Sequence, residues 1–586
     1  MTERLFIIFS ENCIRNFKYK KNLNINNFFF LTPNLETKFK NKFNFQINKI
    51  ISEYNFKEKE EIITRSKTII DKIDKENKIF KNNISLYKTI YHFLYIILNG
   101  LQYIDKIVPN NYEYVYFENQ WKQNKNKDKI LTLIANFYSE KKVGVFKIPQ
   151  NENIKFKFLI NLYNKHLINS SKNKEKFLYA ATNYGFKNIF KLVYKRFDNV
   201  ENFVLQRSTK NTFLSCIKNI INIYIFKNKN YKILYLIPDK KDIYQKNLKI
   251  NNLINKILDK KTIIHSNNIS LIVQNLNNYI ENNIDQNFEI LKKLNPKKFL
   301  CHHIRWGDNL ITSSNLNKLN IPVYLISHGS HSINDNDIIN KEVLIHLSDM
   351  LISPHANKLI IQSPITNHCL KNFDLNYSIF KSKPIMWAFK NFQNKTKNKK
   401  TFTILHASTT KVFSTRPFMY ETSHEYLKGL KKLCEVIERI KNTKLIIRFR
   451  PTEEIDLHTV TKELSKYKNI SIITGGDFIE DLNNSDLLVS YSSTTIEEAL
   501  YLRKPVLLYG GSNDYIHISK KFRGNLANNG RNIIFHNNNN LFKLLSDIKH
   551  DFYNKPVLNS EINQYIYNTK NTDNYDFINN FIINNE

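Results

Sequence analysis

The sequence predicts an α/β fold with parallel, doubly wound sheets, and three features of the chain carry that prediction. From about residue 231, short apolar runs that are typical of strands alternate with helical intervals. From residue 402 to 509 the same alternation becomes more regular, with mostly short loops. A polar, basic stretch at 390–400, KNFQNKTKNKK, separates the two regions. Because strands that alternate with helices form βαβ units, we expect one domain at 1–389, a linker at 390–400 and a second domain at 401–586.

The first 230 residues show the least regular pattern. A strand is expected at 5–9, helical periodicity occurs between 60 and 107, a buried strand is expected at 142–148, and 151–195 is expected to be largely helical. Further strands are expected at 232–237, 262–265, 298–304 and 323–327. We therefore expect the first domain to be Rossmann-like and to begin with a helical, divergent region.

The second half has a clear order of elements. Strands are expected at 402–406, 444–449, 470–474, 486–490 and 505–509, with helices at 423–441, 457–467, 478–483 and 495–502. This order predicts a doubly wound sheet. Such sheets bind ligands at the carboxyl ends of their strands, so the residues that follow each strand are the candidate site.

The composition limits the classes of function. At 586 residues, and roughly 100 to 200 residues per domain, the chain should hold two to four domains. The formal net charge of +36 is spread along the whole chain, without zinc-finger spacing, an RNP-like aromatic motif or a concentrated basic arm. These features disfavour nucleic-acid binding and favour a basic solvated surface. Attraction to anionic lipid headgroups or an anionic polysaccharide is the alternative.

The five cysteines, which are odd in number, far apart and without a CxxC pair, argue against a disulfide framework or a zinc site. No apolar run is long enough for a signal peptide or a membrane span. We therefore expect a cytoplasmic protein, with peripheral contact at the inner membrane face as an option.

The segment at 485–509, SDLLVSYSSTTIEEALYLRKPVLLY, carries the strongest functional pattern. An apolar strand runs into four hydroxyl residues and then into a helix. Backbone N–H groups at a helix start can receive a diphosphate, and Glu498, one turn further on, could accept bonds from two ribose hydroxyls. Alternatively, Thr494 and Glu497 form only a capping box. The hydroxyl residues are Ser492, Ser493, Thr494 and Thr495.

This segment resembles the C-terminal donor-binding domain of GT-B glycosyltransferases, particularly bacterial enzymes of capsule and surface-polysaccharide synthesis. The resemblance lies in the run D-x-x-x-S-x-S-S-T-x-x-x-E-A-x-x-x-x-x-P-V at 486–506, and it extends over about 298–515. Related runs occur in sialyl- and Kdo-type transferases and in glycerophosphotransferases. The resemblance therefore implies two Rossmann-like domains that face a cleft and a nucleotide-sugar donor, with a CMP-linked sugar as one option, but it does not identify the sugar.

Two further strand ends match the donor side of that family. Arg448 and Arg450 end a strand where many relatives carry a Lys-Pro-His-Pro-like sequence, and the histidine is absent here. Arginines can clamp phosphate bidentately. In an enzyme without a metal, a cation of the loop after 402–406 would neutralise the leaving diphosphate. The donor-side residues expected in that loop are His406, Ser408, Thr409, Lys411 and Arg416.

Two loops of the first domain supply candidates for the base that takes a proton from an acceptor hydroxyl: Asp308, His328 and His331. His328 begins an H-G-S sequence that resembles a loop of surface-carbohydrate enzymes. His302 and His303 are adjacent on a strand and point to opposite faces, so we expect no metal site. The pairs Gly475-Gly476 and Gly510-Gly511 either lie beside the donor base or form tight turns.

The sequence thus predicts a metal-independent glycosyltransferase that moves a sugar from a nucleotide-activated donor to a surface glycan or a lipid-linked acceptor. Three alternatives remain open: a CDP-glycerol-type glycerophosphotransferase, a sugar-nucleotide 2-epimerase, and a non-catalytic glycan-binding protein on the same fold.

Overall fold

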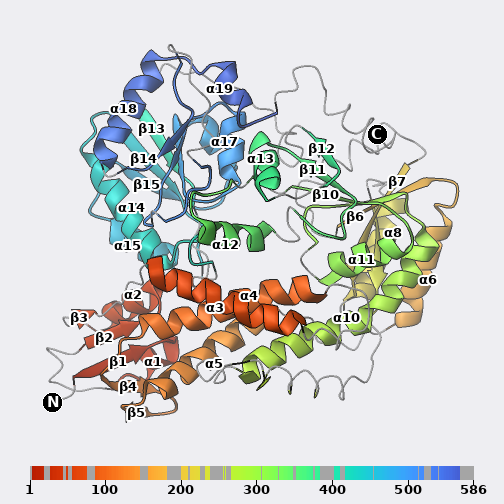
Figure 1. The fold of residues 1–586 in the computed structure, drawn as a ribbon, viewed down its shortest axis with the longest axis horizontal. Helices are drawn as coiled ribbons and strands as arrows, with labels where there is room; N and C mark the ends of the chain where they lie inside the picture. Colours follow the sequence, from red (N-terminus) through yellow and green to blue (C-terminus); the bar gives the residue numbers. More distant parts are fainter. Residues whose placement is uncertain are drawn as a thin grey trace.

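The described residues form three sheets with helices around them (Figure 1). The computed structural model describes residues 3–18, 27–43, 48–49, 56–75, 86–145, 156–180, 200–208, 211–224, 231–237, 248, 252, 255–256, 258, 266–304, 307–327, 329–330, 332–347, 352–373, 377–382, 401–408, 416–452, 454–512, 514–519, 530–538 and 540–567. The predicted linker at 390–400 and the predicted strand at 262–265 lie outside these residues.

The C-terminal domain is built on a six-stranded parallel sheet of order β15-β14-β13-β16-β17-β18. Counted along the chain, this is the 3-2-1-4-5-6 order of a Rossmann sheet. All nine predicted strands and helices are confirmed, to within a few residues at their ends. The elements are β13 (Phe402–His406), α14 (Ser423–Glu438), β14 (Thr443–Arg448), α15 (Leu457–Leu464), β15 (Ile470–Ile473), α16 (Phe478–Asn483), β16 (Leu487–Ser490), α17 (Thr495–Tyr501), β17 (Val506–Leu508), β18 (Ile534–His536), α18 (Leu541–Asn554) and α19 (Asn559–Asn563).

The middle domain is built on a seven-stranded parallel sheet of order β12-β11-β10-β9-β6-β7-β8. Read from β8, the order along the chain is again 3-2-1-4-5-6, with β12 added at the far edge. The predicted α/β class with two Rossmann-like domains is therefore confirmed. The strands are β6 (Glu175–Tyr179), β7 (Val200–Arg207), β8 (Lys232–Leu236), β9 (Lys298–Cys301), β10 (Val323–Ile326), β11 (Lys358–Ile361) and β12 (Ile379–Lys381). The helices are α6 (Lys157–Asn169), α8 (Thr212–Tyr224), α10 (Ser266–Leu294), α11 (Gly307–Lys318), α12 (Asp337–Leu347) and α13 (Pro364–Asn372).

The N-terminal module, residues 3–145, has a five-stranded sheet of its own, of order β3-β2-β1-β4-β5, with only β5 antiparallel. The predicted strand at 5–9 is β1, and the helical periodicity at 60–107 corresponds to α3 and α4. The other strands of this sheet were not predicted. Together with the sheet of the middle domain, the described part of residues 1–389 contains two sheets. The elements are β1 (Arg4–Ile8), α1 (Glu11–Arg15), β2 (Asn27–Phe30), α2 (Pro33–Lys42), β3 (Asn48–Lys49), α3 (Phe56–Lys75), α4 (Leu86–Ile107), β4 (Glu113–Phe117), β5 (Trp121–Asn124) and α5 (Lys127–Val145).

Two predictions before residue 200 are wrong. The strand expected at 142–148 begins inside α5, which continues to Val145. A short apolar run fits the end of a helix as well as a buried strand, and periodicity alone does not separate them. Among the described residues of the stretch 151–195, which was expected to be largely helical, α6 is a helix but Glu175–Tyr179 forms β6. The apolar half of β6 is buried inside the sheet, which favours the extended conformation.

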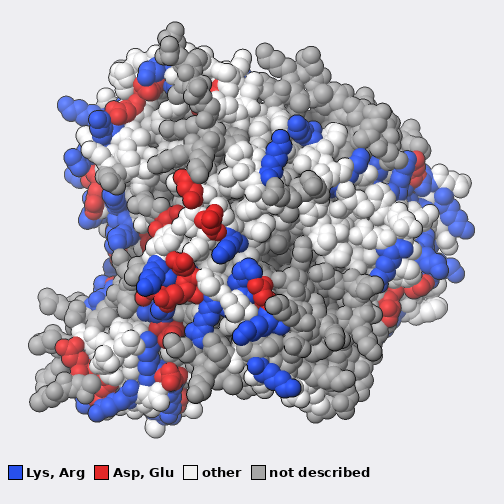
Figure 2. All heavy atoms as spheres, in the orientation of Figure 1, with Lys and Arg blue, Asp and Glu red and all other residues white. Residues whose placement is uncertain are grey.

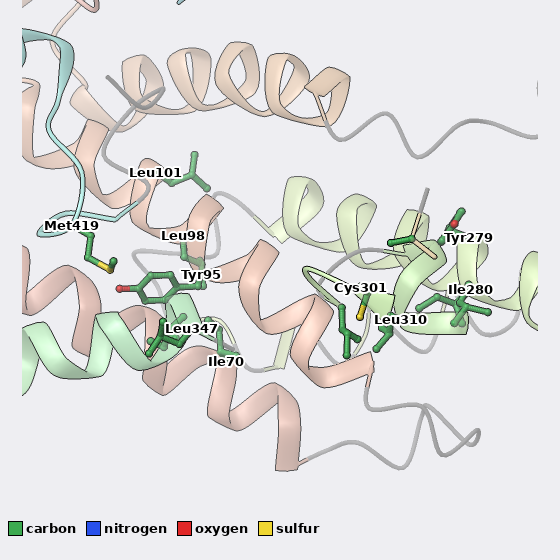
Figure 3. Close-up of a cluster of buried hydrophobic side chains, with 14 of the residues drawn as sticks. Ile70, Tyr95, Leu98, Leu101, Tyr279, Ile280, Cys301, Leu310, Leu347 and Met419 are labelled. Atoms are coloured by element: carbon green, nitrogen blue, oxygen red, sulfur yellow. The ribbon is translucent and has the colours of Figure 1, made fainter. Parts of the chain in front are cut away.

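Buried apolar side chains join the three parts. One cluster spans the N-terminal module and the middle domain, and it includes Met419 and Tyr491 of the C-terminal domain. Figure 3 shows part of it, with Tyr95 of α4 between Leu347 of α12 and Met419. Two further clusters cover the two faces of the C-terminal sheet. Charged side chains of both signs are spread over the face drawn in Figure 2. In the described part of the chain, no helix combines the length and apolar character needed to cross a bilayer.

Candidate functional site

The strand order of the C-terminal sheet reverses between β13 and β16, and their carboxyl ends are tied together there. Ser490 Oγ donates to Ala407 O at 2.9 Å, and the Tyr491 backbone N–H donates to Ser408 Oγ at 2.8 Å. Ligands of doubly wound sheets bind at such a switch point. The predicted residue Ser408 is buried at this point.

The hydroxyl run follows β16 directly, and its four residues, Ser492 to Thr495, are half-buried. The capping-box alternative is wrong: Thr494 makes no side-chain cap bond, and the Glu497 carboxylate points to another domain. Thr495 Oγ1 is buried, with no hydrogen-bond partner among the described residues. Glu498 is half-buried one turn into α17. At the start of α17, Ser493 Oγ accepts from Thr495 N at 3.3 Å.

The loop after β10 of the middle domain contacts this run. The backbone N–H of Ser330 donates to Glu497 Oε1 at 2.6 Å, and its hydroxyl donates to the same oxygen. A Cβ on Gly329 would lie 3.0 Å from Thr494 Cγ2, so glycine permits this close approach. Burial raises the pKa of Glu497, but nearby His517 and the two Ser330 donors outweigh it and hold the pKa below its ordinary value.

The same loop continues along the segment after β17. Ser332 Oγ accepts from Ser519 N at 2.5 Å and donates to His517 O at 3.2 Å. Asn334 Oδ1 accepts from Ile516 N at 3.2 Å. A cavity of about 420 Å³ beside it is lined by Asn334, α12 and the end of α13. The carboxyl ends of the two Rossmann-like sheets therefore face each other, as the resemblance implies. His328 and His331 lie outside the described residues.

Asp308 lies at the second switch point, where β9 neighbours β6, in the first turn of α11. Its carboxylate accepts a hydrogen bond from the Tyr279 hydroxyl, and an Arg207 guanidinium nitrogen lies 3.7 Å away. The guanidinium also stacks on the Tyr279 ring at 4.0 Å from its centroid. Burial, and then the Asp308 charge, raise the pKa of Tyr279, so its hydroxyl stays a donor. Arg207 and Tyr279 were not predicted, although an arginine at the end of the apolar run VENFVLQR was the available signal.

The basic residues of the donor side differ in exposure. Arg448 donates to the Asp481 carboxylate and to Gly476 O, the latter at 2.7 Å, so it holds the turn after β15. Arg416 is buried and donates to the Tyr420 hydroxyl at 2.5 Å. Arg450 is exposed at the end of β14. Thr409 and Lys411 lie outside the described residues. Arg450 is thus the described arginine of this edge that is most open to a ligand.

His406 ends β13 and is buried. Burial lowers its pKa to about 4, so the imidazole is neutral at neutral pH. Its Nδ1 has no hydrogen-bond partner among the described residues. The neutral imidazole packs against the Tyr426 ring of α14, with the ring centroids 5.8 Å apart.

The two glycine pairs have different roles. Gly475 and Gly476 adopt φ of +75° and +77°, which is the left-handed conformation of a tight turn. Gly511 packs on α14, where a Cβ would lie 1.8 Å from Glu425 O. A Cβ on Gly510 would lie 2.4 Å from the Tyr491 ring. The second pair therefore allows close packing behind the hydroxyl run.

Sequence reasoning missed a group of buried ionisable residues beside that packing. Glu421 Oε1 accepts from Gly511 N at 2.6 Å, and burial raises the pKa of Glu421 to about 8. Glu342 of α12 accepts from Phe418 N at 2.9 Å, and burial raises its pKa to about 7. Lys59 of α3 lies 2.6 Å from Asp514. These contacts join distant segments, so no local pattern reveals them.

Among the described residues, no three or more His, Cys, Asp or Glu side chains lie close enough together to hold a metal ion. Metal independence stays a prediction.

No family model and no curated protein sequence matches this chain. Several solved structures are similar to it at low identity. TarM is 12% identical over 70% of this chain and 99% of its own, with a TM-score of 0.37. UDP-GlcNAc 2-epimerase from Neisseria meningitidis bound to UDP-GlcNAc is 13% identical over 57% and 82%, with a TM-score of 0.32. HepE from Anabaena, in complex with UDP and glucose, is 11% identical over 64% and 89%, with a TM-score of 0.32. The assignment of two Rossmann-like domains stands on the strand orders of this chain.

Proposed function

We propose that this chain is a metal-independent glycosyltransferase that transfers a sugar from a nucleotide-activated donor to a surface glycan or lipid-linked acceptor. One observation carries the proposal: the carboxyl ends of two Rossmann-like sheets meet where Ser330 binds Glu497, beside the hydroxyl run. A site between two such edges can hold a nucleotide on one side and an acceptor on the other.

The C-terminal domain provides the donor side of this proposal. The half-buried hydroxyls of the run are hydrogen-bond donors for phosphate, and Thr495 Oγ1 has an unused bonding capacity. Arg450 adds an exposed guanidinium two residues after β14, the strand next to β13. Glu498 would bind the ribose. Lys411 and Arg416 remain the candidates for neutralising the leaving diphosphate.

The middle domain provides the acceptor side. Asp308 is the described candidate base, because its carboxylate is oriented by Tyr279 and Arg207 at the switch point of that sheet. A carboxylate held in this way could take the proton from an acceptor hydroxyl as it attacks the sugar.

Nucleotide binding is the first test. A ligand that binds only the folded protein stabilises it by about 2.7 kcal/mol at a hundredfold excess over Kd. We expect one of CMP, CDP, UDP, GDP or ADP to raise Tm, with the shift kept in EDTA and lost in Glu498→Ala. Glu480→Ala is the matched control, because Glu480 is exposed on α16 of the same domain. If no nucleotide raises Tm, the donor site is refuted and a glycan-binding role becomes the better account.

Transfer is the second test. Asp308→Asn should lower kcat about 10² to 10⁴-fold, the usual contribution of a positioned acid or base, and should leave the nucleotide-dependent Tm shift intact. Glu289→Gln, at an exposed residue of α10 in the same domain, is the control. Equal activity of Asp308→Asn and wild type would remove Asp308 from the mechanism.

Product analysis separates the other reactions that this architecture could perform. With CDP-glycerol, a glycerophosphotransferase leaves CMP and a phosphodiester on the acceptor. A 2-epimerase changes the donor sugar without any acceptor. Formation of a glycosidic bond together with release of the free nucleotide supports the proposed reaction.

A further inference from the structure

Most of the exposed large apolar side chains of the described chain lie on two neighbouring helices of the middle domain, α6 and α8. Phe158 is 72% exposed on α6, and Leu214 is 66% exposed on α8. The Phe156 and Phe213 rings, at the starts of the two helices, pack with centroids 4.6 Å apart. The exposed members of this surface, the α6–α8 face, are Phe156, Phe158, Leu159, Leu162, Leu214, Ile217, Ile220 and Ile221.

Each helix carries apolar residues on two sides: one side packs against the protein, and the other is exposed to solvent. On α6, Ile160, Tyr163 and Leu167 are buried against the sheet, while Phe158 and Leu162, four residues apart, point outward. On α8, the exposed residues 214, 217 and 221 follow the i, i+3, i+7 spacing of one helix face. Single exposed apolar residues need no explanation, but a continuous apolar face marks a docking surface.

The charges on the same helices have one sign. Lys157 and Lys165 are exposed on α6, and Lys218 is exposed on α8 between the apolar residues. Neither helix contains an Asp or Glu. The carboxylate of Glu201, at the start of β7, is paired with the ammonium groups of Lys174 at 3.5 Å and Lys232 at 2.7 Å. In Figure 2, blue side chains lie among white ones on the right flank, where Figure 1 shows α6 and α8.

We propose that the α6–α8 face docks on an anionic membrane surface, with its apolar side chains in the headgroup region and its lysines on lipid phosphates. Apolar residues flanked by lysine are the composition of helices that lie in a membrane interface. Docking of a second copy fits less well. A two-fold interface would place the lysines of both copies together without an acidic residue on either helix to pair with them.

The position of this face suits an acceptor that is anchored in lipid. Helix α8 begins at Thr212, five residues after Arg207, which contacts Asp308. A membrane at the α6–α8 face would therefore lie close to the candidate base. This consequence rests on the proposed function, whereas docking itself does not.

Vesicle co-sedimentation tests the proposal. The wild-type protein should bind vesicles of phosphatidylglycerol and phosphatidylcholine, and binding should weaken with salt and with pure phosphatidylcholine. The lysine variant is Lys157→Gln/Lys165→Gln/Lys218→Gln. Each lysine near an anionic surface contributes about fivefold to partitioning, so this variant should bind roughly a hundredfold more weakly. The apolar variant, Phe158→Ser/Leu162→Ser/Leu214→Ser/Ile217→Ser, should lose binding to both vesicle types.

Exposed residues elsewhere give matched controls. Leu457→Ser changes an apolar residue of α15 that is 39% exposed, and Lys466→Gln changes an exposed lysine. Both should bind vesicles like wild type. All variants should keep a cooperative unfolding transition and remain folded at the assay temperature, because the changed side chains are exposed.

Three outcomes would overturn the proposal: no binding by wild type, equal binding by variants and controls, or a concentration-dependent dimer that the apolar variant abolishes. The last outcome would make the face an interface between copies. An intact nucleotide-dependent Tm shift in the apolar variant, with loss of vesicle binding, separates this surface from the donor site. The proposed function can thus fail while docking holds, and the reverse.

Discussion

The segment that follows β17 is held from two sides, and the two contacts differ in kind. From the N-terminal module, Lys59 is buried with its ammonium 2.6 Å from Asp514 and 3.4 Å from Glu425. From the middle domain, Ser332 and Asn334 reach the same segment through uncharged hydrogen bonds. One contact encloses a cation between carboxylates, and the other joins neutral groups.

This difference indicates which contact can open. Removing one partner of a buried ion pair costs about 3 to 5 kcal/mol, whereas a typical neutral hydrogen bond contributes about 0.5 to 1.5 kcal/mol. The Lys59 contact should therefore stay closed, and the contact of Ser332 and Asn334 should be the one that opens when the two domains move apart. In enzymes, closure of loops or domains around a ligand commonly limits turnover.

The largest effect is expected from Lys59→Met. The variant leaves two half-buried carboxylates without their cation, so the free energy of unfolding should fall by up to about 3 to 5 kcal/mol in urea denaturation. Burial lowers the pKa of Lys59, but the charges of Glu425 and Asp514 outweigh it and raise the pKa above 10.5. The contribution of Lys59 is therefore complete below that value and is lost only as pH rises through the higher folded value.

Lys67→Met is the matched control for this prediction. Lys67 lies on the same helix and pairs with Asp71, but it is 42% exposed, so its loss should cost less than about 1 kcal/mol. Equal losses of unfolding free energy in the two variants would mean that the Lys59 contact is no stronger than an exposed ion pair. The proposed difference between the two contacts of the segment after β17 would then be wrong.

A pH-dependent effect of intermediate size is expected from Glu421→Gln. The carboxyl of Glu421 has a pKa of about 8, raised from 4.5 mainly by burial and further by Glu425. Between these values the folded state keeps a proton that the unfolded state has lost, so stability falls as pH rises through this window. Glutamine does not titrate, and its Oε1 can still accept from Gly511 N. The variant should lose less stability than wild type from about pH 5 to about pH 8, by an amount on the order of a few kcal/mol.

Denaturation at a series of pH values checks this slope. Glu342, whose pKa is about 7, adds the same pH dependence to the stability of both proteins, so its effect cancels in the difference between them. Glu438→Gln is the control, because Glu438 is exposed at the end of α14. Parallel stability curves for wild type and Glu421→Gln would show that Glu421 is already ionised in the folded protein.

The C-terminal domain could be predicted because its signals are local. Buried strands read as continuous apolar runs, and helix starts carry their own caps: Thr422 with Glu425 forms a capping box, and Asp456 and Asp477 cap the next two helices. The position of the hydroxyl run after β16 follows from the same order. The sequence therefore placed the hydroxyl run at the carboxyl edge of this sheet, where the structure has it.

The contacts around that site could not be predicted, because their partners are far apart in the chain. Glu497 and Ser330 are 167 residues apart, and Lys59 and Asp514 are 455 apart. T-x-x-E at 494–497 has the sequence of a capping box, yet a partner from another domain takes its glutamate. In the N-terminal module, the two-residue strand β3 is too short to leave a periodic pattern.

The smallest effect is expected from Ser330→Ala, which tests the neighbouring hydrogen bond from the same loop to the Glu497 carboxylate. The variant removes the hydroxyl donor to Glu497 but keeps the backbone N–H at 2.6 Å, so the carboxylate retains a partner. Unfolding free energy should fall by about 1 kcal/mol. The depressed pKa of Glu497 makes this contribution present above about pH 4.5 and lost as pH falls through the folded value, so the difference between variant and wild type should shrink in acid.

Ser546→Ala is the control for this last measurement, because the Ser546 hydroxyl bonds only within α18, to Phe542 O at 2.8 Å. Hydrogen exchange of residues 329–334 gives a second readout. It should rise in Ser330→Ala and stay unchanged in Ser546→Ala, because only the first change weakens the contact between domains. If Ser330→Ala instead costs as much as Lys59→Met, both contacts are equally fixed, and opening must occur at another place between the domains.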